Sequence, residues 1–297
     1  MIIILAFGFY DGEHIMGNGI YRVYVQTNDK QLFGAKLSAY SLLKNCATPQ
    51  LLEVKILNVK NYPIIEEKHG KTYLRKGVKR KWDKTDLQSF TLTRFLPPFL
   101  QNFSGRALVI DPDVFASKLC DIVDLFETTS SDKGIYCVPQ KSSVMLLDCS
   151  KLLHWDFPKN IQELFELKRD YRDWMSLKLE DPSSIGDLSS VWNDCDHLTS
   201  ETRLIHFTRR VTQPWKTGLK VDFNYDNQGG PIKRAIRKIL KKKNTEDYYI
   251  QNPYSDQVDF FFDLMKNAIE DNAITLFDLE KNISQGFVRS DLINYLK

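Results

Sequence analysis

The chain has 297 residues, of which 41 are lysine or arginine and 38 aspartate or glutamate, so its formal net charge is +3. Hydrophobic residues make up 42% and aromatic residues 12%, which excludes wholesale disorder and collagen-like or coiled-coil architectures. A charge this close to zero argues against a dedicated nucleic-acid coat protein, and the length predicts one large domain or one domain with an annex.

The first residues of the chain and its cysteines indicate the cellular compartment. The first ten residues are almost all apolar, but a span of the bilayer takes about 20 residues. They also lack a basic leader, so we expect a buried strand or a packed arm rather than a signal peptide. The five cysteines contain no C-x-x-C pair, which indicates buried thiols of a reducing, cytoplasmic compartment rather than disulfides or a zinc knuckle.

Apolar runs alternate with helical patterns over the first two thirds of the chain. In chain order the patterns predict a strand at 22–26, a helix over 35–43, and strands at 53–57, 106–110, 134–138, 144–147 and 203–207. Apolar strands separated by helices favour an α/β layered fold whose sheet is buried on both faces.

The pattern changes in the last quarter of the chain. Residues 224–231 are rich in Asn, Asp and Gly and predict a linker, and a proline then opens a predicted helix over 232–243. Apolar residues recur at helical spacing over 258–269, and Thr275 with an acidic residue three positions later predicts another helix start. We therefore expect a helical C-terminal subdomain.

A pair of aspartates, Asp111 and Asp113, flanks a proline directly after the predicted strand 106–110. In open α/β sheets ligands bind beyond the carboxyl ends of strands, and carboxylates at positions i and i+2 can point to the same side. Two hard oxygen donors suit Mg²⁺ or Mn²⁺, which would neutralise the charge of a diphosphate leaving group. Taken alone, such a pair is more often a solvated turn.

Further motifs stand in a fixed order around this pair. They are S-F-T-L-T-R-F-L-P-P-F-L at 89–100, G-R-A-L-V-I-D-P-D-V-F at 105–115, and L-I-H-F-T-R-R-V-T-Q-P-W-K-T-G at 204–218. Together they resemble the retaining, metal-dependent glycosyltransferases of family 8, the glycogenin and lipopolysaccharide galactosyltransferase family, in particular a bacterial-type branch. The resemblance covers roughly residues 20–220.

This resemblance implies a GT-A fold, which is a Rossmann-like, three-layer α/β domain that binds nucleotide-diphosphate sugars. The domain would span 1–222, and the helical C-terminal subdomain 223–297. The implied enzyme is a hexosyltransferase that moves a hexose, with retention, from a nucleotide-diphosphate sugar such as a UDP-sugar to an acceptor hydroxyl. The acceptor would be a carbohydrate, a lipid-linked group or a protein, and the cofactor Mn²⁺ or Mg²⁺.

The matching motifs assign roles residue by residue. Asp111, Asp113 and His206 match the three metal ligands of the family, and an imidazole beside two carboxylates favours Mn²⁺ over Mg²⁺. Arg94 matches the arginine of the helix before the aspartates, which in the family lies by the nucleotide sugar. Asp187 is the nearest candidate for the acidic or amide residue near the anomeric carbon.

The loop after the first predicted strand and the segment after the histidine complete the implied donor site. Thr27 and Asn28 match the loop that cradles the uracil and ribose. The best-known members carry a glycine three residues after the histidine and a lysine just before Pro-Trp, where this chain has Arg209 and Gln213. Lys216 or a nearby arginine would then supply the cation that binds the diphosphate. The usual N-A-G before the V-M-L strand is K-S-S here, which leaves the transferred sugar undetermined.

Two other functions remain open. The departures from the family pattern motivate a catalytically silent relative that only binds a nucleotide sugar. A nucleotidyltransferase can also place an aspartate pair beyond a sheet edge, but it should carry a phosphate-binding loop rich in Gly, Arg and Lys near the N-terminus. The only comparable run is G-N-G at 17–19.

Positive charge is concentrated in two segments, with eight lysines and arginines in 68–84 and seven in 232–243. The ordinary interpretation of the predicted helix 232–243 is a surface helix packed on the catalytic domain with a solvated basic face. For 232–243, which has one apolar stripe at helical spacing, the alternative is peripheral contact with the anionic inner face of a membrane, where a lipid-linked acceptor would reside. No nucleic-acid-binding motif is recognised, so we expect no nucleic-acid partner.

Overall fold

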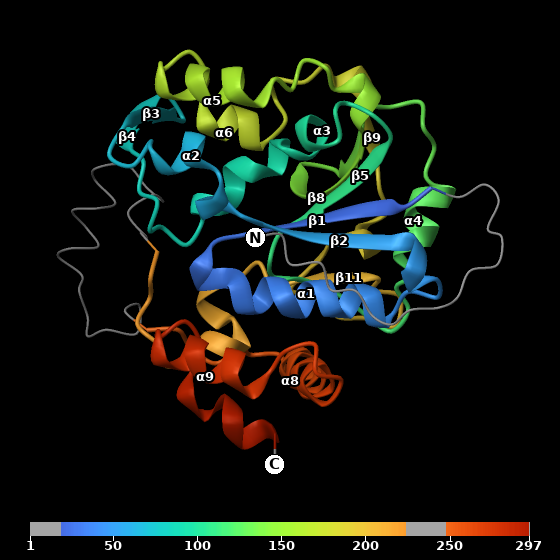
Figure 1. Cartoon of the computed structure of the whole chain (residues 1–297), viewed down its shortest axis with the longest axis vertical. Coiled ribbons are helices and arrows are strands. Elements are labelled where there is room, and N and C mark those ends of the chain that lie inside the picture. Colours follow the sequence, from blue (N-terminus) through green and yellow to red (C-terminus); the bar gives the residue numbers. More distant parts are fainter. Residues whose placement is uncertain (1–18, 224–247, 297) are drawn as a thin grey trace.

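The computed structural model describes residues 19–223 and 248–296 (Figure 1). The predicted N-terminal strand or arm, the predicted linker and the basic helix predicted over 232–243 lie outside the described residues. Within the described part of the chain, no helix combines the length and the apolar character needed to cross a membrane.

Strands and helices alternate through the first two thirds of the chain. The strands are β1 (Tyr21–Thr27), β2 (Leu52–Asn58), β3 (Thr72–Arg75), β4 (Val78–Lys81), β5 (Arg106–Ile110), β6 (Val114–Ala116), β7 (Ile135–Val138), β8 (Lys141–Asp148), β9 (Ile185–Asp187), β10 (Asp194–Cys195) and β11 (Leu204–His206). The helices are α1 (Leu32–Lys44), α2 (Pro63–Glu66), the 3₁₀ helix η4 (Ser89–Phe95), α3 (Pro97–Leu100), α4 (Ile122–Thr128), α5 (Phe157–Phe165), α6 (Tyr171–Met175), α8 (Ser255–Glu270) and α9 (Leu276–Ser284). The six strands predicted from the sequence and the predicted helices α1, α8 and α9 are confirmed.

The main sheet has the strand order β2-β1-β5-β8-β7-β9. Strand β1 is parallel to β2 and β5, β8 is antiparallel to β5 and β7, and β7 is parallel to β9. Strands β1, β5, β7 and β9 therefore end at the same edge of the sheet. This geometry brings together the segments that follow them.

Both faces of the main sheet are buried, which confirms the predicted three-layer α/β fold. Alternate residues of a strand point to opposite faces: Val23 and Val25 belong to the apolar cluster under α1 and α4, whereas Tyr24 belongs to the cluster under η4, α5 and α6. Figure 1 shows α1 on one side of the sheet and α3, α5 and α6 on the other.

Helices α8 and α9 pack against α1 (Figure 1). Phe261 and Met265 of α8 share one buried cluster with Phe33 and Leu37 of α1 and with Trp215. The predicted helical C-terminal part is therefore present and docked on the α/β layers. The predicted boundary after residue 222 stays a prediction.

The basic segment 68–84 forms a hairpin that the sequence patterns did not predict. Strands β3 and β4 pair in antiparallel register, and the two turn residues Lys76 and Gly77 both have positive φ, 56° and 70°, as a two-residue hairpin turn of type I′ requires. The carboxylate of Asp170 accepts the backbone N–H groups of Lys76 and Gly77 at 3.1 and 2.8 Å, which fixes the turn.

Candidate functional site

The aspartate pair lies in the turn directly after β5, packed against the first helix. The backbone N–H of Asp111 donates to the carbonyl of Ser143 at 3.0 Å. On the other side, a Cβ atom added at Gly34 of α1 would lie 2.8 Å from the carbonyl oxygen of Pro112. Only a glycine allows the helix to come so close to this turn, so α1 and β8 together fix the position of the two aspartates.

A second, smaller sheet brings His206 to the same place. Strand β11 pairs antiparallel with β6, so that His206 lies opposite Val114, and the N–H of Phe207 donates to the carbonyl of Asp113 at 3.0 Å. One ligand atom from each of Asp111, Asp113 and His206 lies within 4.8 Å of the others. The structure thus joins the three predicted ligands, which are far apart in the sequence.

This donor set fits a hard or borderline divalent cation. Two carboxylates and one imidazole offer oxygen and nitrogen, the ligands that Mg²⁺ and Mn²⁺ accept. Opposite ligands of an octahedral Mg²⁺ ion are about 4.2 Å apart, so the spacing of up to 4.8 Å needs only a small contraction. The side chains of Asp113 and His206 are 11% and 8% exposed, so a bound ion would be largely shielded from water.

Arg94 and Gln26 hold the carboxylate of Asp111. One guanidinium nitrogen of Arg94, at the end of η4, lies 2.7 and 3.0 Å from the two carboxylate oxygens, and the amide of Gln26 at the end of β1 donates to one of them. Burial raises the pKa of Asp111, and the charge of Arg94 opposes that rise. A second guanidinium nitrogen of Arg94 donates to the hydroxyl of Ser142 at 2.8 Å.

His206 is held by polar residues on its far side. Its Nδ1 lies 2.9 Å from the amide oxygen of Asn193 and 3.2 Å from the hydroxyl of Ser143. A proton on Nδ1, donated to Asn193, leaves Nε2 to face Asp113 at 3.3 Å. Burial alone would lower the pKa of His206, but the carboxylate of Asp113 raises it to about 10. A bound cation would take the place of the second proton, the one on Nε2, and the proton on Nδ1 would stay.

Gln213 contacts the site directly. Its side-chain amide donates to the second carboxylate oxygen of Asp113 at 3.0 Å, and it is fully buried. Sequence reasoning marked Gln213 as a departure without giving it a partner. It also missed Gln26 and the link from Asn193 through Ser143 to the histidine, because no local pattern reports contacts between distant segments.

Thr27 and Asn28 lie at the end of β1, next to the strand that leads to Asp111. The amide nitrogen of Asn28 donates to the carbonyl of Leu87 and the hydroxyl of Ser89, both at 3.0 Å, and its oxygen accepts the N–H of Gln31 at 3.1 Å. Asn28 therefore anchors the chain that leads into η4. Its predicted contact with a nucleoside stays a prediction, as does that of Thr27.

Lys216 pairs with a carboxylate outside the cluster, and Asp187 lies on another strand. Lys216 is 1% exposed, and its ammonium lies 3.0 Å from a carboxylate oxygen of Asp222; burial lowers the pKa of Lys216, and Asp222 opposes the shift. Asp187 is the exposed last residue of β9, three strands from β5, or about 14 Å at the usual strand spacing. The structure places Asp187 on the edge that carries the cluster and not within it.

Of the comparisons with known proteins, only the comparison with solved structures gave matches. No family model matches the chain, and no curated protein matches its sequence. Mouse xyloside xylosyltransferase 1 aligns with 12% identity and a TM-score of 0.42, over 65% of this chain and 98% of that one. The glycosyltransferase GlyE of Streptococcus pneumoniae aligns with 14% identity and a TM-score of 0.47, over 76% of this chain and 61% of its own.

A third structure is the galactosyltransferase LgtC in complex with donor and acceptor sugar analogs. It aligns with 12% identity and a TM-score of 0.43, over 76% of this chain and 98% of that one. Likenesses of this size assign no activity to the present chain, so its function is argued from the site.

Proposed function

We propose that this protein is a metal-dependent glycosyltransferase of the GT-A fold. It would transfer a hexose, with retention, from a nucleotide-diphosphate sugar, a UDP-sugar, to an acceptor hydroxyl. The observation that carries the proposal is the cluster of Asp111, Asp113 and His206 at the carboxyl edge of an α/β sheet. The order of the surrounding motifs, which resembles that of family 8, supports it.

The residues around the cluster have separate tasks in this proposal. Bound Mn²⁺ or Mg²⁺ would supply positive charge that neutralises the departing diphosphate. Arg94 and Gln213 hold the two carboxylates in place, and Asn193 fixes the orientation of His206. Such fixed groups stabilise developing charge without the cost of reorganisation at the moment of reaction. The segment at the end of β1, with Thr27 and Asn28, is the proposed position of the nucleoside.

A same-face displacement is the simplest mechanism for this chain, because it needs no nucleophilic side chain. The bond between the anomeric carbon and the diphosphate oxygen breaks while the acceptor oxygen bonds to the same face of the sugar. The acceptor proton passes to the departing diphosphate oxygen, so no enzyme nucleophile is consumed. The chain contributes positioning of the two reactants and charge stabilisation.

The direct test is hydrolysis of a panel of nucleotide-diphosphate sugars by the full chain, with Mn²⁺, with Mg²⁺ and with a chelator. We expect metal-dependent turnover of one donor, which would also identify the sugar. Binding of a donor without turnover would instead establish a catalytically silent relative. Nucleotide transfer to a sugar phosphate would establish a nucleotidyltransferase, and either result would overturn the proposal.

A further inference from the structure

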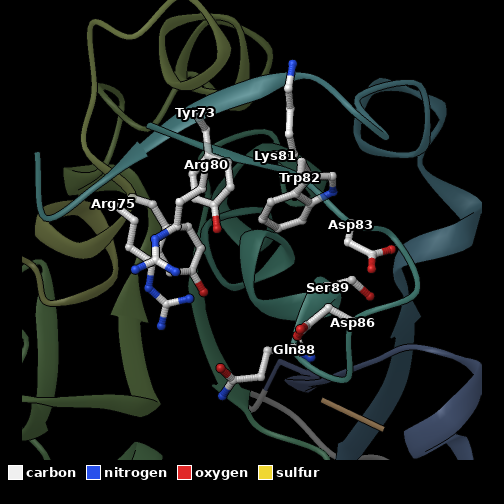
Figure 2. Close-up of a pocket in the computed structure, with 10 residues that line it drawn as sticks. Tyr73, Arg75, Arg80, Lys81, Trp82, Asp83, Asp86, Gln88 and Ser89 are labelled. Carbon is white, nitrogen blue, oxygen red and sulfur yellow. Dashed lines mark hydrogen bonds between the residues drawn. The ribbon is translucent and has the colours of Figure 1, made fainter. Parts of the chain in front are cut away.

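A pocket of about 250 Å³ lies between the β3–β4 hairpin and the chain that leads into η4 (Figure 2). Three aromatic rings line it, those of Tyr73, Trp82 and Tyr171, with centroids 5.6 to 6.3 Å apart. Pockets for drug-sized ligands span roughly 300–1,000 Å³, so this one suits a small group better than a nucleoside diphosphate.

Two arginines form one side of the pocket. Figure 2 shows Arg75 and Arg80 together, with Asp83 and Asp86 on the opposite side. The guanidinium of Arg75 lies over the ring of Tyr171, 4.9 Å from its centroid. Within residues 19–223 and 248–296, neither arginine forms an ion pair, whereas nearby Lys84 pairs with a glutamate. Their charges are thus available to a ligand.

Two buried donors at this pocket lack a partner among the described residues. They are Nε of Arg80 and the indole N–H of Trp82, and the side chain of Trp82 is buried, at 5% exposed. Both donors belong to the polar wall of the pocket, next to its aromatic rings.

Helix η4 connects the pocket to the cluster of Asp111, Asp113 and His206. Ser89, at the pocket, begins this 3₁₀ helix, and Arg94, which binds Asp111, lies five residues later. At a rise of about 2 Å per residue, the two positions are about 10 Å apart along the helix. Asn28, at the end of β1, ties the same segment to the sheet edge. The pocket and the cluster of Asp111, Asp113 and His206 therefore share η4 as a common element.

We propose that this pocket binds the acceptor, and that the acceptor is a saccharide carrying an anionic group, a phosphate or a carboxylate. This proposal rests on the proposed function, and it adds the chemical class of the acceptor. Guanidinium groups bind both anions through charge-assisted hydrogen bonds. The aromatic side chains, each 5% or 6% exposed, offer apolar contacts at the pocket wall, and the carboxylates of Asp83 and Asp86 offer acceptors for the hydroxyl groups of a sugar.

Calorimetric titration of the full chain, without metal or donor, tests the pocket directly. The probes are glucose 6-phosphate, glucuronate, uncharged glucose and inorganic phosphate. We expect an anionic sugar to bind at least about tenfold more tightly than glucose, as a charge-assisted contact implies. The phosphate and carboxylate probes distinguish the two sources of charge. The proposal would be overturned if glucose bound as tightly as the anionic sugars, or if neither anionic sugar bound. It would also be overturned if inorganic phosphate bound as tightly as the anionic sugars, because the sugar would then contribute nothing.

Substitutions on the hairpin locate the binding. We expect Arg80→Gln and Arg75→Gln each to weaken binding of the anionic sugar at least about tenfold. Lys79→Gln is the matched control, because Lys79 is an exposed cation of the same strand that does not line the pocket. Thermal melting verifies that each variant is folded. If the control weakens binding as much as Arg80→Gln, the attraction is a general property of the basic hairpin and the proposal fails.

Failure of this inference and failure of the proposed function give different results. Probe binding is measured without metal or donor, whereas the proposed function is tested by metal-dependent donor hydrolysis. Donor hydrolysis without probe binding would overturn the acceptor pocket alone. If the protein binds the probe and hydrolyses no donor, the pocket is a binding site but its role as an acceptor site is overturned.

Discussion

Arg94 and Asp111 form a buried ion pair between η4 and the turn after β5. One guanidinium nitrogen lies 2.7 and 3.0 Å from the two carboxylate oxygens, and the side chains are 8% and 13% exposed. Asp111 is also a predicted metal ligand, so the geometry of the cluster depends on a residue 17 positions earlier in the chain. The pair therefore couples the folding of η4 to the formation of the site.

The first prediction concerns the stability of this pair. Arg94→Met leaves the carboxylate of Asp111 buried and without its cation, and we expect it to lower the free energy of unfolding by about 3 kcal/mol or more in metal-free protein. Adding Asp111→Asn should restore a large part of that loss, because the uncompensated charge is then gone. Urea unfolding of the single and double variants measures both effects; strictly additive losses would show that the residues do not interact.

The second prediction concerns the metal. Asp113→Ala and His206→Ala each remove one of three clustered ligands, so we expect either variant to lose Mn²⁺ affinity at least about 100-fold and to abolish metal-dependent donor hydrolysis. Calorimetric titration with Mn²⁺ and a product assay measure the two properties. Asp173→Asn, which changes an aspartate with a side chain 44% exposed, is the control. Normal hydrolysis by either cluster variant would contradict the assignment.

The sequence predicted six strands of the described structure, because most of them are short runs rich in apolar residues, whereas the three-residue buried strand β6 was too short to be marked. The hairpin of β3 and β4 was also missed: its strands have four residues each, and β4 is exposed at most positions and has three basic residues, so no apolar run marks them. Its pairing depends instead on the two-residue turn at Lys76 and Gly77, which Asp170 stabilises from another part of the chain.

The cluster itself was predictable, whereas its support was not. Asp111, Asp113 and His206 stand in motifs whose order can be read along the chain. Gln213 contacts Asp113 because the chain folds back after β11, and Asn193 contacts His206 because β10, which follows Asn193, pairs with β11. A side chain that acts through such long-range contacts leaves no signal in its own neighbourhood of the sequence.

The third prediction tests Asp187, whose predicted role lies near the anomeric carbon. If its carboxylate acts there, Asp187→Asn lowers kcat for donor turnover about 100-fold and changes KM by less than about threefold, because the lost interaction is made only in the transition state. Steady-state kinetics separates the two constants. Asp181→Asn alters an exposed aspartate just before the same strand and should change neither. An unaltered kcat in Asp187→Asn would remove this residue from the mechanism.

The fourth prediction uses Gly34, where α1 approaches the turn between the two aspartates. Glycine to alanine inside a helix ordinarily stabilises a protein by about 0.5–1 kcal/mol. Here the new methyl group would lie 2.8 Å from the carbonyl oxygen of Pro112, so we expect Gly34→Ala to destabilise by about 1–3 kcal/mol and to weaken Mn²⁺ binding. Urea unfolding and calorimetry measure these changes. Gly19→Ala, at a site with open space, is the control; a stabilised Gly34→Ala would contradict the packing.

The fifth prediction concerns the contact that docks α9 on α1. The carboxylate of Asp278 lies 2.8 Å from the ammonium of Lys36 and completes a capping box with Thr275. Burial raises the pKa of Asp278, but Lys36 and the Thr275 backbone outweigh it, and the net pKa is lowered. The ionised carboxylate therefore contributes stability that is present above its unfolded-state pKa of about 4 and is lost as the pH falls through the folded-state value.

We accordingly expect Asp278→Asn to lower the free energy of unfolding by about 1–2 kcal/mol at pH 7. The difference from the unaltered protein should shrink at pH 3, where the natural aspartate is itself becoming protonated. Urea unfolding at both pH values measures this. Glu280→Gln, an exposed position on the same helix, should show little effect at either pH. A difference of equal size at pH 3 and pH 7 would mean that the contribution of Asp278 does not depend on its charge.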